Sequence, residues 1–256
     1  MSQRIERILR LAVSVYCWST FLLIGGIYVL FAFHSLVYAA ITGADRLRFV
    51  QLGNAIFFSA WRHSLFFSTV DIQNAERFKR ARRDFSRLIV VSNHQSLIDM
   101  VVIIPFITPF FSFGKEAFGR IPFFGRLMGL GGNLFLRSGD AAGLKIVFDI
   151  AKSRIENGET LFLFPEGTRQ GGAALNDFKD GAFRLTVETG ASLLPMAISG
   201  TSDFLQNRSL IVTKLPPYRF VLTVGEPIEP SVHGGDANKL KAMAREQIER
   251  MLTATA

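Results

Sequence analysis

The feature that most constrains this chain is an apolar run near its start, from Leu11 to Thr42, that contains no Asp, Glu, Lys or Arg. Such a run predicts a segment inserted in a membrane. It exceeds the roughly 7–15 residues of a signal-peptide core, which disfavours a cleaved leader. One span needs about 20 residues, and two full spans with a turn need more than about 40. The run is therefore long for one span and short for two.

Glycines and flanking charges suggest how this run is arranged. Gly25 and Gly26 stand near its middle. Arginines flank it on both sides: Arg4, Arg7, Arg10, Arg46 and Arg48. Because positive flanks stay on the cytoplasmic side, we expect both ends there. We predict a short membrane-anchoring helical hairpin over residues 1–45 and a catalytic domain over residues 46–256; a single tilted span is the alternative.

Composition favours a protein that works at a membrane surface. Of 256 residues, 49% are hydrophobic; mean hydropathy is +0.28 and net charge is +8. A basic and apolar chain is typical of proteins that bind anionic lipid surfaces. Nucleic-acid binding is the other interpretation of basic charge, but no zinc-finger spacing or aromatic RNA-binding signature supports it. The single cysteine, Cys17, excludes an internal disulfide and offers no metal cluster.

Beyond about residue 87, short apolar runs alternate with helical patterns, whereas residues from about 43 to 87 look helical and basic. The runs predicted as strands cover residues 87–91, 110–113, 133–136, 160–164, 192–198, 210–213 and 219–224. The helical patterns cover residues 141–158, 180–190 and 236–252. This alternation predicts an α/β fold, with a mostly parallel sheet flanked by helices and an N-terminal membrane-embedded two-helix segment.

A histidine and an aspartate lie five positions apart in the segment NHQSLID, just after the first predicted strand. Residues five apart cannot meet within a regular helix or strand. They can meet if the strand ends near Asn93 and a helix begins near Ser96. Asp99 would then fix the tautomer of His94, whose other ring nitrogen could take a proton from a substrate hydroxyl. The alternative is a structural histidine, with Asp99 as a first-turn acid favoured by the helix dipole.

The segment FPEGTR, residues 164–169, follows another predicted strand and has the composition of an anion site. Gly167 lets backbone approach a ligand, Thr168 brings a hydroxyl, and Arg169 brings a planar fork suited to phosphate. Glu166 would repel phosphate, so we expect it to hold Arg169 or to accept a hydrogen bond from an uncharged hydroxyl. The alternative is an ordinary turn with a surface ion pair.

Two more cations lie near predicted strand ends. Arg137 follows a strand, and Lys115 belongs to an apolar, glycine-rich segment, residues 114–132, that could enter the membrane or line an acyl channel. In a parallel sheet the carboxyl ends of the strands share one edge, where ligands bind. We therefore expect Arg137, Arg169 and His94 to share that edge.

Four segments, in order, resemble the characteristic blocks of the glycerophospholipid acyltransferases. They are NHQSLID (93–99), GKEAFGRIPFFGRLMGLGGNLFLR (114–137), FPEGTR (164–169) and LLPMAISG (193–200). The fourth is otherwise interpreted as structural. The resemblance covers roughly residues 86–201 and is nearest to the bacterial type that acylates 1-acyl-glycerol-3-phosphate. It also implies that the apolar N-terminal hairpin docks on the bilayer.

The resemblance implies a role for each candidate residue. His94 would be the general base on the acceptor hydroxyl, with Asp99 orienting it. Lys115 would stabilise the oxyanion of the thioester, as a preorganised positive group can. The acceptor phosphate would be held by Arg137, Gly167 and Arg169, with Glu166 and Thr168 shaping the pocket. The hydroxyl would attack an acyl thioester directly, so no covalent enzyme intermediate, cofactor or metal is expected.

The predicted function is transfer of a fatty acyl group from acyl-CoA or acyl-carrier protein to the sn-2 hydroxyl of lysophosphatidate, giving phosphatidate for phospholipid biosynthesis. The expected location is the cytoplasmic face of the inner membrane, with the bilayer as partner. Other acceptors remain open: glycerol-3-phosphate, a lysophospholipid or a lyso-aminolipid. A non-catalytic protein that binds anionic lipids is an alternative from another class. A metal-dependent hydrolase is disfavoured, because the four histidines lack zinc-type spacing.

Overall fold

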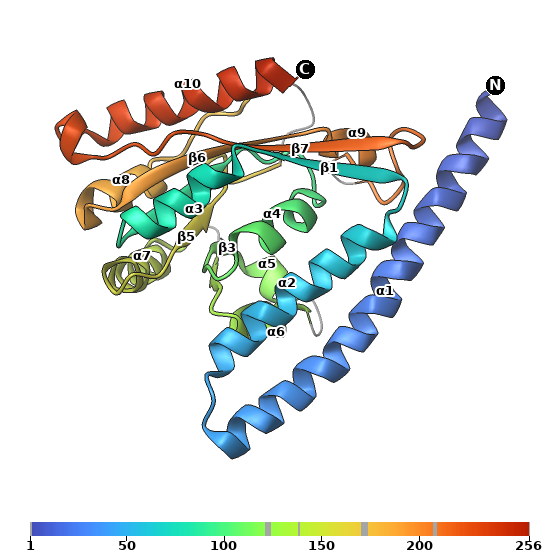
Figure 1. The fold of residues 1–256 in the computed structure, drawn as a ribbon, viewed down its shortest axis with the longest axis horizontal. Helices are drawn as coiled ribbons and strands as arrows, with labels where there is room; N and C mark the ends of the chain where they lie inside the picture. Colours follow the sequence, from blue (N-terminus) through green and yellow to red (C-terminus); the bar gives the residue numbers. More distant parts are fainter. Residues whose placement is uncertain (1, 121–123, 138, 170–173, 207–208, 256) are drawn as a thin grey trace.

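A computed structural model describes residues 2–120, 124–137, 139–169, 174–206 and 209–255 (Figure 1). Its N-terminal half contains α1 (Gln3–Thr42), α2 (Arg46–Ser64), β1 (Ser68–Gln73), α3 (Ala75–Asp84), β2 (Leu88–Ser92), α4 (Asp99–Ile107), β3 (Phe113–Lys115), α5 (Glu116–Gly119) and α6 (Phe124–Leu130). The C-terminal half contains β4 (Leu134–Leu136), α7 (Ala141–Glu156), β5 (Leu161–Leu163), α8 (Gly181–Thr189), β6 (Ser192–Ser199), α9 (Thr201–Phe204), β7 (Tyr218–Val224), η1 (Ser231–His233) and α10 (Ala237–Thr255).

The main sheet has the strand order β1-β7-β6-β2-β5. Its neighbours are parallel except for β6 and β7, which confirms the predicted mostly parallel sheet. A second, parallel pair, β3–β4, lies beyond β5. Phe111 joins the two sheets through a parallel bridge to Leu161. The carboxyl ends of β2, β5, β3 and β4 therefore face the same edge of the molecule.

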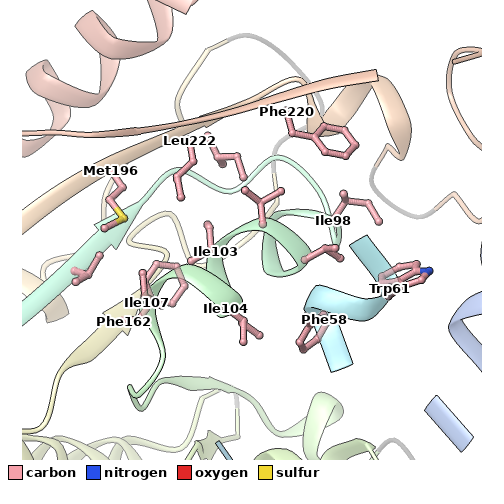
Figure 2. Close-up of a cluster of buried hydrophobic side chains, with 14 of the residues drawn as sticks. Phe58, Trp61, Ile98, Ile103, Ile104, Ile107, Phe162, Met196, Phe220 and Leu222 are labelled. Atoms are coloured by element: carbon pink, nitrogen blue, oxygen red, sulfur yellow. The ribbon is translucent and has the colours of Figure 1, made fainter. Parts of the chain in front are cut away.

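Helices cover both faces of the main sheet, because alternate residues of its strands point to opposite sides. On one face, the sheet packs against α2 and α4 through a core that includes Phe58, Ile104, Phe162, Met196 and Leu222 (Figure 2). On the other face, a second core includes residues of α7, α8 and α10, among them Ile155, Phe183 and Ile248. Helices therefore lie on both sides of the sheet, and α4 lies between the sheet and α2.

The N-terminal apolar run forms one continuous helix, α1, of 40 residues. The predicted turn near Gly25 and Gly26 is therefore wrong, and so is a hairpin contained within residues 1–45. The chain instead turns at Gly43, which ends α1 in a left-handed conformation, and at Asp45, whose carboxylate caps the first turn of α2. A glycine inside a helix costs only about 1 kcal/mol relative to alanine, which packing and helix continuity can offset.

A two-helix arrangement does exist, but α1 forms it with α2 (Figure 1). The two helices approach closely at Gly53, where a Cβ atom would lie 2.9 Å from the ring of Tyr28. On its other side, α2 packs against α4. The helix α2 therefore ties α1 to the sheet, whereas the division of the chain at residues 45 and 46 stays a prediction.

By length and composition, α1 could cross a membrane, and little of its most apolar stretch is buried within the protein. Its exposed apolar side chains include Leu22, Leu23, Ile27, Leu30, Phe33 and Ile41. An exposed apolar surface of this kind is typical of membrane contact. The helix is thus consistent with membrane anchoring.

Two other predictions of secondary structure are wrong. Residues 43–87 are not wholly helical, because the half-buried edge strand β1 lies between α2 and α3. Residues 210–213 form no strand. Their backbone instead bonds to α1: Trp18 donates to the Leu210 carbonyl (2.7 Å), and Val212 N–H donates to Ser14 Oγ (2.9 Å). These contacts hold residues 209–213 against α1.

Candidate active site

The site begins where β2 ends. Asn93 is buried, and its side-chain amide exchanges two hydrogen bonds with the backbone of Ile198 in β6: Nδ2 donates to the carbonyl at 2.9 Å, and Oδ1 accepts from the N–H at 2.8 Å. An amide that pairs with a neighbouring strand in this way fixes the path of the chain beyond β2. His94 follows on a turn before α4, as predicted.

His94 and Asp99 meet. The Nδ1 atom of His94 lies 2.7 Å from Oδ2 of Asp99, and the same oxygen accepts from the N–H groups of Gln95 (2.7 Å) and Ser96 (3.0 Å). The Asp99 side chain is fully buried, whereas that of His94 is 15% exposed. Since an ionised carboxylate only accepts, we assign the proton of this contact to Nδ1. The Nε2 atom is then left with a free lone pair.

An aromatic ring fixes the plane of the imidazole. Phe164, just after β5, stacks on His94 with ring centroids 3.8 Å apart and planes 12° from parallel. Phe164 itself packs edge-on against Phe162 of β5, at 4.9 Å. Phe164 was not among the predicted site residues. Its place at the head of the FPEGTR segment, directly before the turn at the sheet edge, was the available signal.

Glu166 connects this turn to the histidine. Its Oε1 accepts from the backbone N–H of His94 at 2.9 Å, and its Oε2 accepts from the N–H of Asn176 at 3.1 Å. The residue is 3% exposed. A buried carboxylate that accepts backbone N–H groups is strongly held in place. Glu166 therefore positions the backbone of His94, a contact that the sequence analysis did not foresee.

Gly167 lies directly beneath a lysine that the sequence analysis also missed. Gly167 has a φ of +65°, and a Cβ atom there would lie 2.7 Å from Nζ of Lys179. The backbone N–H of Lys179 donates to the carbonyl of Pro165 at 2.8 Å, which holds the lysine over the turn. A side chain at residue 167 would thus be strained and would displace an ammonium group.

Arg169 is half-buried on the same turn, whereas Thr168 is exposed. Burial lowers the pKa of the Arg169 guanidinium, and the negative charge of Asp99 acts on that pKa in the opposite direction. Arg169 follows Glu166 by three positions on this turn, and Glu166 contacts the backbone of His94. The structure thus brings His94, Asp99, Glu166 and Arg169 together.

Lys115 and Arg137 lie at the carboxyl end of the small sheet. Lys115 is the last residue of β3 and is in register with Leu136 of β4, so Arg137 follows one position later. Both side chains are exposed. Because β3 and β4 run in the direction of β5, both cations lie at strand ends that face the same edge as His94. Their contact with a substrate stays a prediction.

The other histidines with described side chains have local roles. His34 and His63 each bond, through Nδ1, to the carbonyl four residues earlier in their own helices, at 2.7 Å. Within the part of the chain that the structure describes, no three His, Cys, Asp or Glu side chains come together as metal ligands would. Among the histidines with described side chains, His94 is thus the one that pairs with a buried carboxylate at the sheet edge.

A part-exposed imidazole that a buried carboxylate orients can act as a general base on a substrate hydroxyl. Comparison with known proteins gives the class. Residues 69–199, more than half of the chain, match the family model described as Acyltransferase. The chain therefore belongs to the acyltransferase family.

Two relatives and one solved structure that are similar to this chain have names that state a more specific activity. The 1-acyl-sn-glycerol-3-phosphate acyltransferase of Haemophilus influenzae is 31% identical over 61% of this chain and 66% of its own. That of Salmonella typhimurium is 30% identical over 66% of this chain and 68% of its own. The chain thus spans about two thirds of the length of these relatives. The crystal structure of the 1-acyl-sn-glycerophosphate (LPA) acyltransferase, PlsC, from Thermotoga maritima matches 97% of this chain and 96% of its own, with 26% identity and a TM-score of 0.78.

Proposed function

We propose that this protein transfers a fatty acyl group from an acyl thioester to the sn-2 hydroxyl of lysophosphatidate, giving phosphatidate. The observation that carries the proposal is the contact between His94 and Asp99 in a chain of the acyltransferase family. Relatives whose names state this reaction support the choice of acceptor. The imidazole would act directly on that acceptor, without a cofactor or metal.

The reaction follows from the free Nε2 atom of His94. It accepts the proton of the sn-2 hydroxyl while the hydroxyl oxygen attacks the thioester carbonyl carbon. The resulting imidazolium is stabilised by Asp99, which already accepts the Nδ1 proton. The C–S bond then breaks, and the thiolate leaves with the proton from His94. Lys115 would stabilise the negative carbonyl oxygen of the tetrahedral intermediate.

The acceptor phosphate would lie near Arg169, Arg137 and Lys179. A phosphomonoester carries about 1.5–2 negative charges at neutral pH, which suits more than one cation. The negative charge of Glu166 would repel phosphate less than that of a solvated carboxylate, because both of its oxygens accept backbone N–H groups. The space above Gly167, with the lysine over it, would admit phosphate oxygens once the flexible lysine side chain moves aside.

The decisive experiment is an acyl-transfer assay on purified protein with a small matrix of substrates. Donors are acyl-CoA and acyl-carrier protein; acceptors are lysophosphatidate, glycerol-3-phosphate and a lysophospholipid with a headgroup. We expect turnover to be highest with lysophosphatidate and unchanged by EDTA. Lipid binding without transfer to any acceptor would support the non-catalytic alternative, and loss of transfer with EDTA would count against metal-free chemistry.

Two arginine substitutions test the acceptor pocket. Lysine keeps the charge but loses the planar fork that binds phosphate through two hydrogen bonds. We expect Arg169→Lys, and similarly Arg137→Lys, to raise the KM for lysophosphatidate several-fold while the donor KM changes little. Poor placement of the hydroxyl should also lower kcat.

Steady-state kinetics with each substrate varied in turn measures both effects. Arg250→Lys is the matched control, because Arg250 is an exposed residue of α10 in a surface ion pair. If the donor KM rises and the acceptor KM does not, the arginines bind the donor and the pocket assignment is reversed.

For the cellular site, we propose the cytoplasmic face of the inner membrane. Acyl-CoA and acyl-carrier protein are both soluble donors, so the site must face the compartment that holds them. The exposed apolar surface of α1 and the net charge of +8 support attachment to an anionic lipid surface.

A further inference from the structure

The fourth sequence block ends beside a threonine that no step of the proposed reaction uses. Thr201 is fully buried, and its hydroxyl donates to Oδ1 of Asp99. Asp99 thus has the N–H donors of His94, Gln95 and Ser96 on one oxygen and a side-chain hydroxyl on the other. A second acceptor for the hydroxyl, Oε1 of Gln95, lies farther away, at 3.3 Å. The charged carboxylate is the stronger acceptor of the two.

The backbone holds this hydroxyl in place from both sides. Gly200, immediately before it, has a φ of +84°, and a Cβ atom there would lie 2.0 Å from the carbonyl oxygen of Arg219. Glycine is thus needed for the chain to pass β7 and enter α9. On the far side, Ser96 Oγ donates to the carbonyl of Leu205 at 2.6 Å, which ties the end of α9 to the turn that carries His94.

We infer that Thr201 is a positioning residue for the proposed acyl transfer, one whose hydroxyl fixes the rotation of the Asp99 carboxylate and thereby the ring of His94. Because the carboxylate is planar, the direction of Oδ1 toward Thr201 and that of Oδ2 toward Nδ1 of His94 are coupled. The hydroxyl also satisfies a buried charged oxygen, which is costly to leave without a partner. The inference rests on the proposed function and adds a residue to it.

Substitutions that differ by one oxygen atom test this inference. Thr201→Ser keeps the hydroxyl and loses the methyl group, whereas Thr201→Ala loses both and Thr201→Val replaces the hydroxyl with a methyl. We expect Ala and Val to lower kcat by about 10- to 100-fold, the range typical of a hydrogen bond to a charged group. Both KM values should stay near those of the wild type, and Thr201→Ser should restore most of kcat.

Thr186→Val is the matched control. Thr186 is equally buried, but its hydroxyl donates to the carbonyl of Ala182 in its own helix, so kcat should be unchanged. Wild-type kcat in Thr201→Ala and Thr201→Val would overturn the inference, as would an equal loss in Thr201→Ser or a rise in KM alone. If only Thr201→Ser folds, the hydroxyl serves folding and the inference also fails. Absence of transfer by the wild-type protein would instead count against the proposed function.

Discussion

Replacing His94 with alanine is expected to lower kcat by about 10²- to 10⁴-fold, the usual contribution of a general base. The reason is that Nε2 of this imidazole is the proton acceptor that the carboxylate of Asp99 orients. Binding should change little, because the side chain is only 15% exposed. Steady-state kinetics on protein of confirmed fold measures the loss.

Asp99→Asn is expected to lower kcat by about 10²-fold or more. The amide oxygen can still accept from Gln95 and Ser96, but the negative charge that stabilises the imidazolium is gone. His63→Ala is the control, since that histidine is exposed and bonds within its own helix. Near-normal kcat in well-folded His94→Ala protein would remove the histidine from the mechanism.

How much of this site the sequence could predict depends on sequence separation. The contact between His94 and Asp99 was predictable, because its partners are five residues apart and a strand followed by a helix is the geometry that lets them meet. The bonds from Glu166 to the His94 backbone and from Thr201 to Asp99 join residues 72 and 102 positions apart. A single sequence contains the residue types for such contacts but not their distances.

The secondary structure, too, was predictable from the sequence only in part. Strands with a continuous apolar pattern, such as β2 and β6, were predicted, because burial on both faces leaves a clear signature. The edge strand β1 was missed, because it is only half-buried and lies beside a strongly charged helix. Residues 210–213 have a strand-like composition, but backbone groups of Leu210 and Val212 bond to α1, nearly 200 residues earlier.

The N-terminal helix gives the clearest case of a wrong local inference. Two adjacent glycines suggested a turn, yet both are part of the continuous helix α1. A Cβ atom at Gly25 would lie 3.7 Å from the ring of Phe57, an ordinary contact distance. The actual turn uses a left-handed Gly43 and a capping Asp45, which are stronger stop and start signals. The glycine pair mattered less than the end signals that surround Ala44.

A charged double substitution in the middle of α1 is expected to detach the protein from membranes. Leu23 and Ile27 are 67% and 61% exposed and lie four residues apart, so they share one face of the helix. Removing each from an apolar environment costs about 1.5–3 kcal/mol. Leu23→Glu with Ile27→Glu should therefore lower partition onto anionic vesicles by about 10²-fold or more, measured by co-sedimentation.

Ile146→Glu is the matched control, because Ile146 is 59% exposed on α7, away from α1 in the fold (Figure 1). Unchanged partition of the double variant would place the membrane contact elsewhere.

The length of α1 bears on its orientation at the membrane. A helix of 40 residues is about 60 Å long, twice the roughly 30 Å of a hydrocarbon core.

Arginines stand at both ends of this straight helix, at Arg4, Arg7 and Arg10 and again at Arg46 and Arg48 just beyond it. Positive flanks favour the cytoplasmic side, so a helix that crosses the membrane would place one group on the disfavoured side. We therefore expect α1 to lie along the cytoplasmic interface, with α2 above it. Labelling of the N-terminus from the far side of the membrane would contradict this orientation and support the single span.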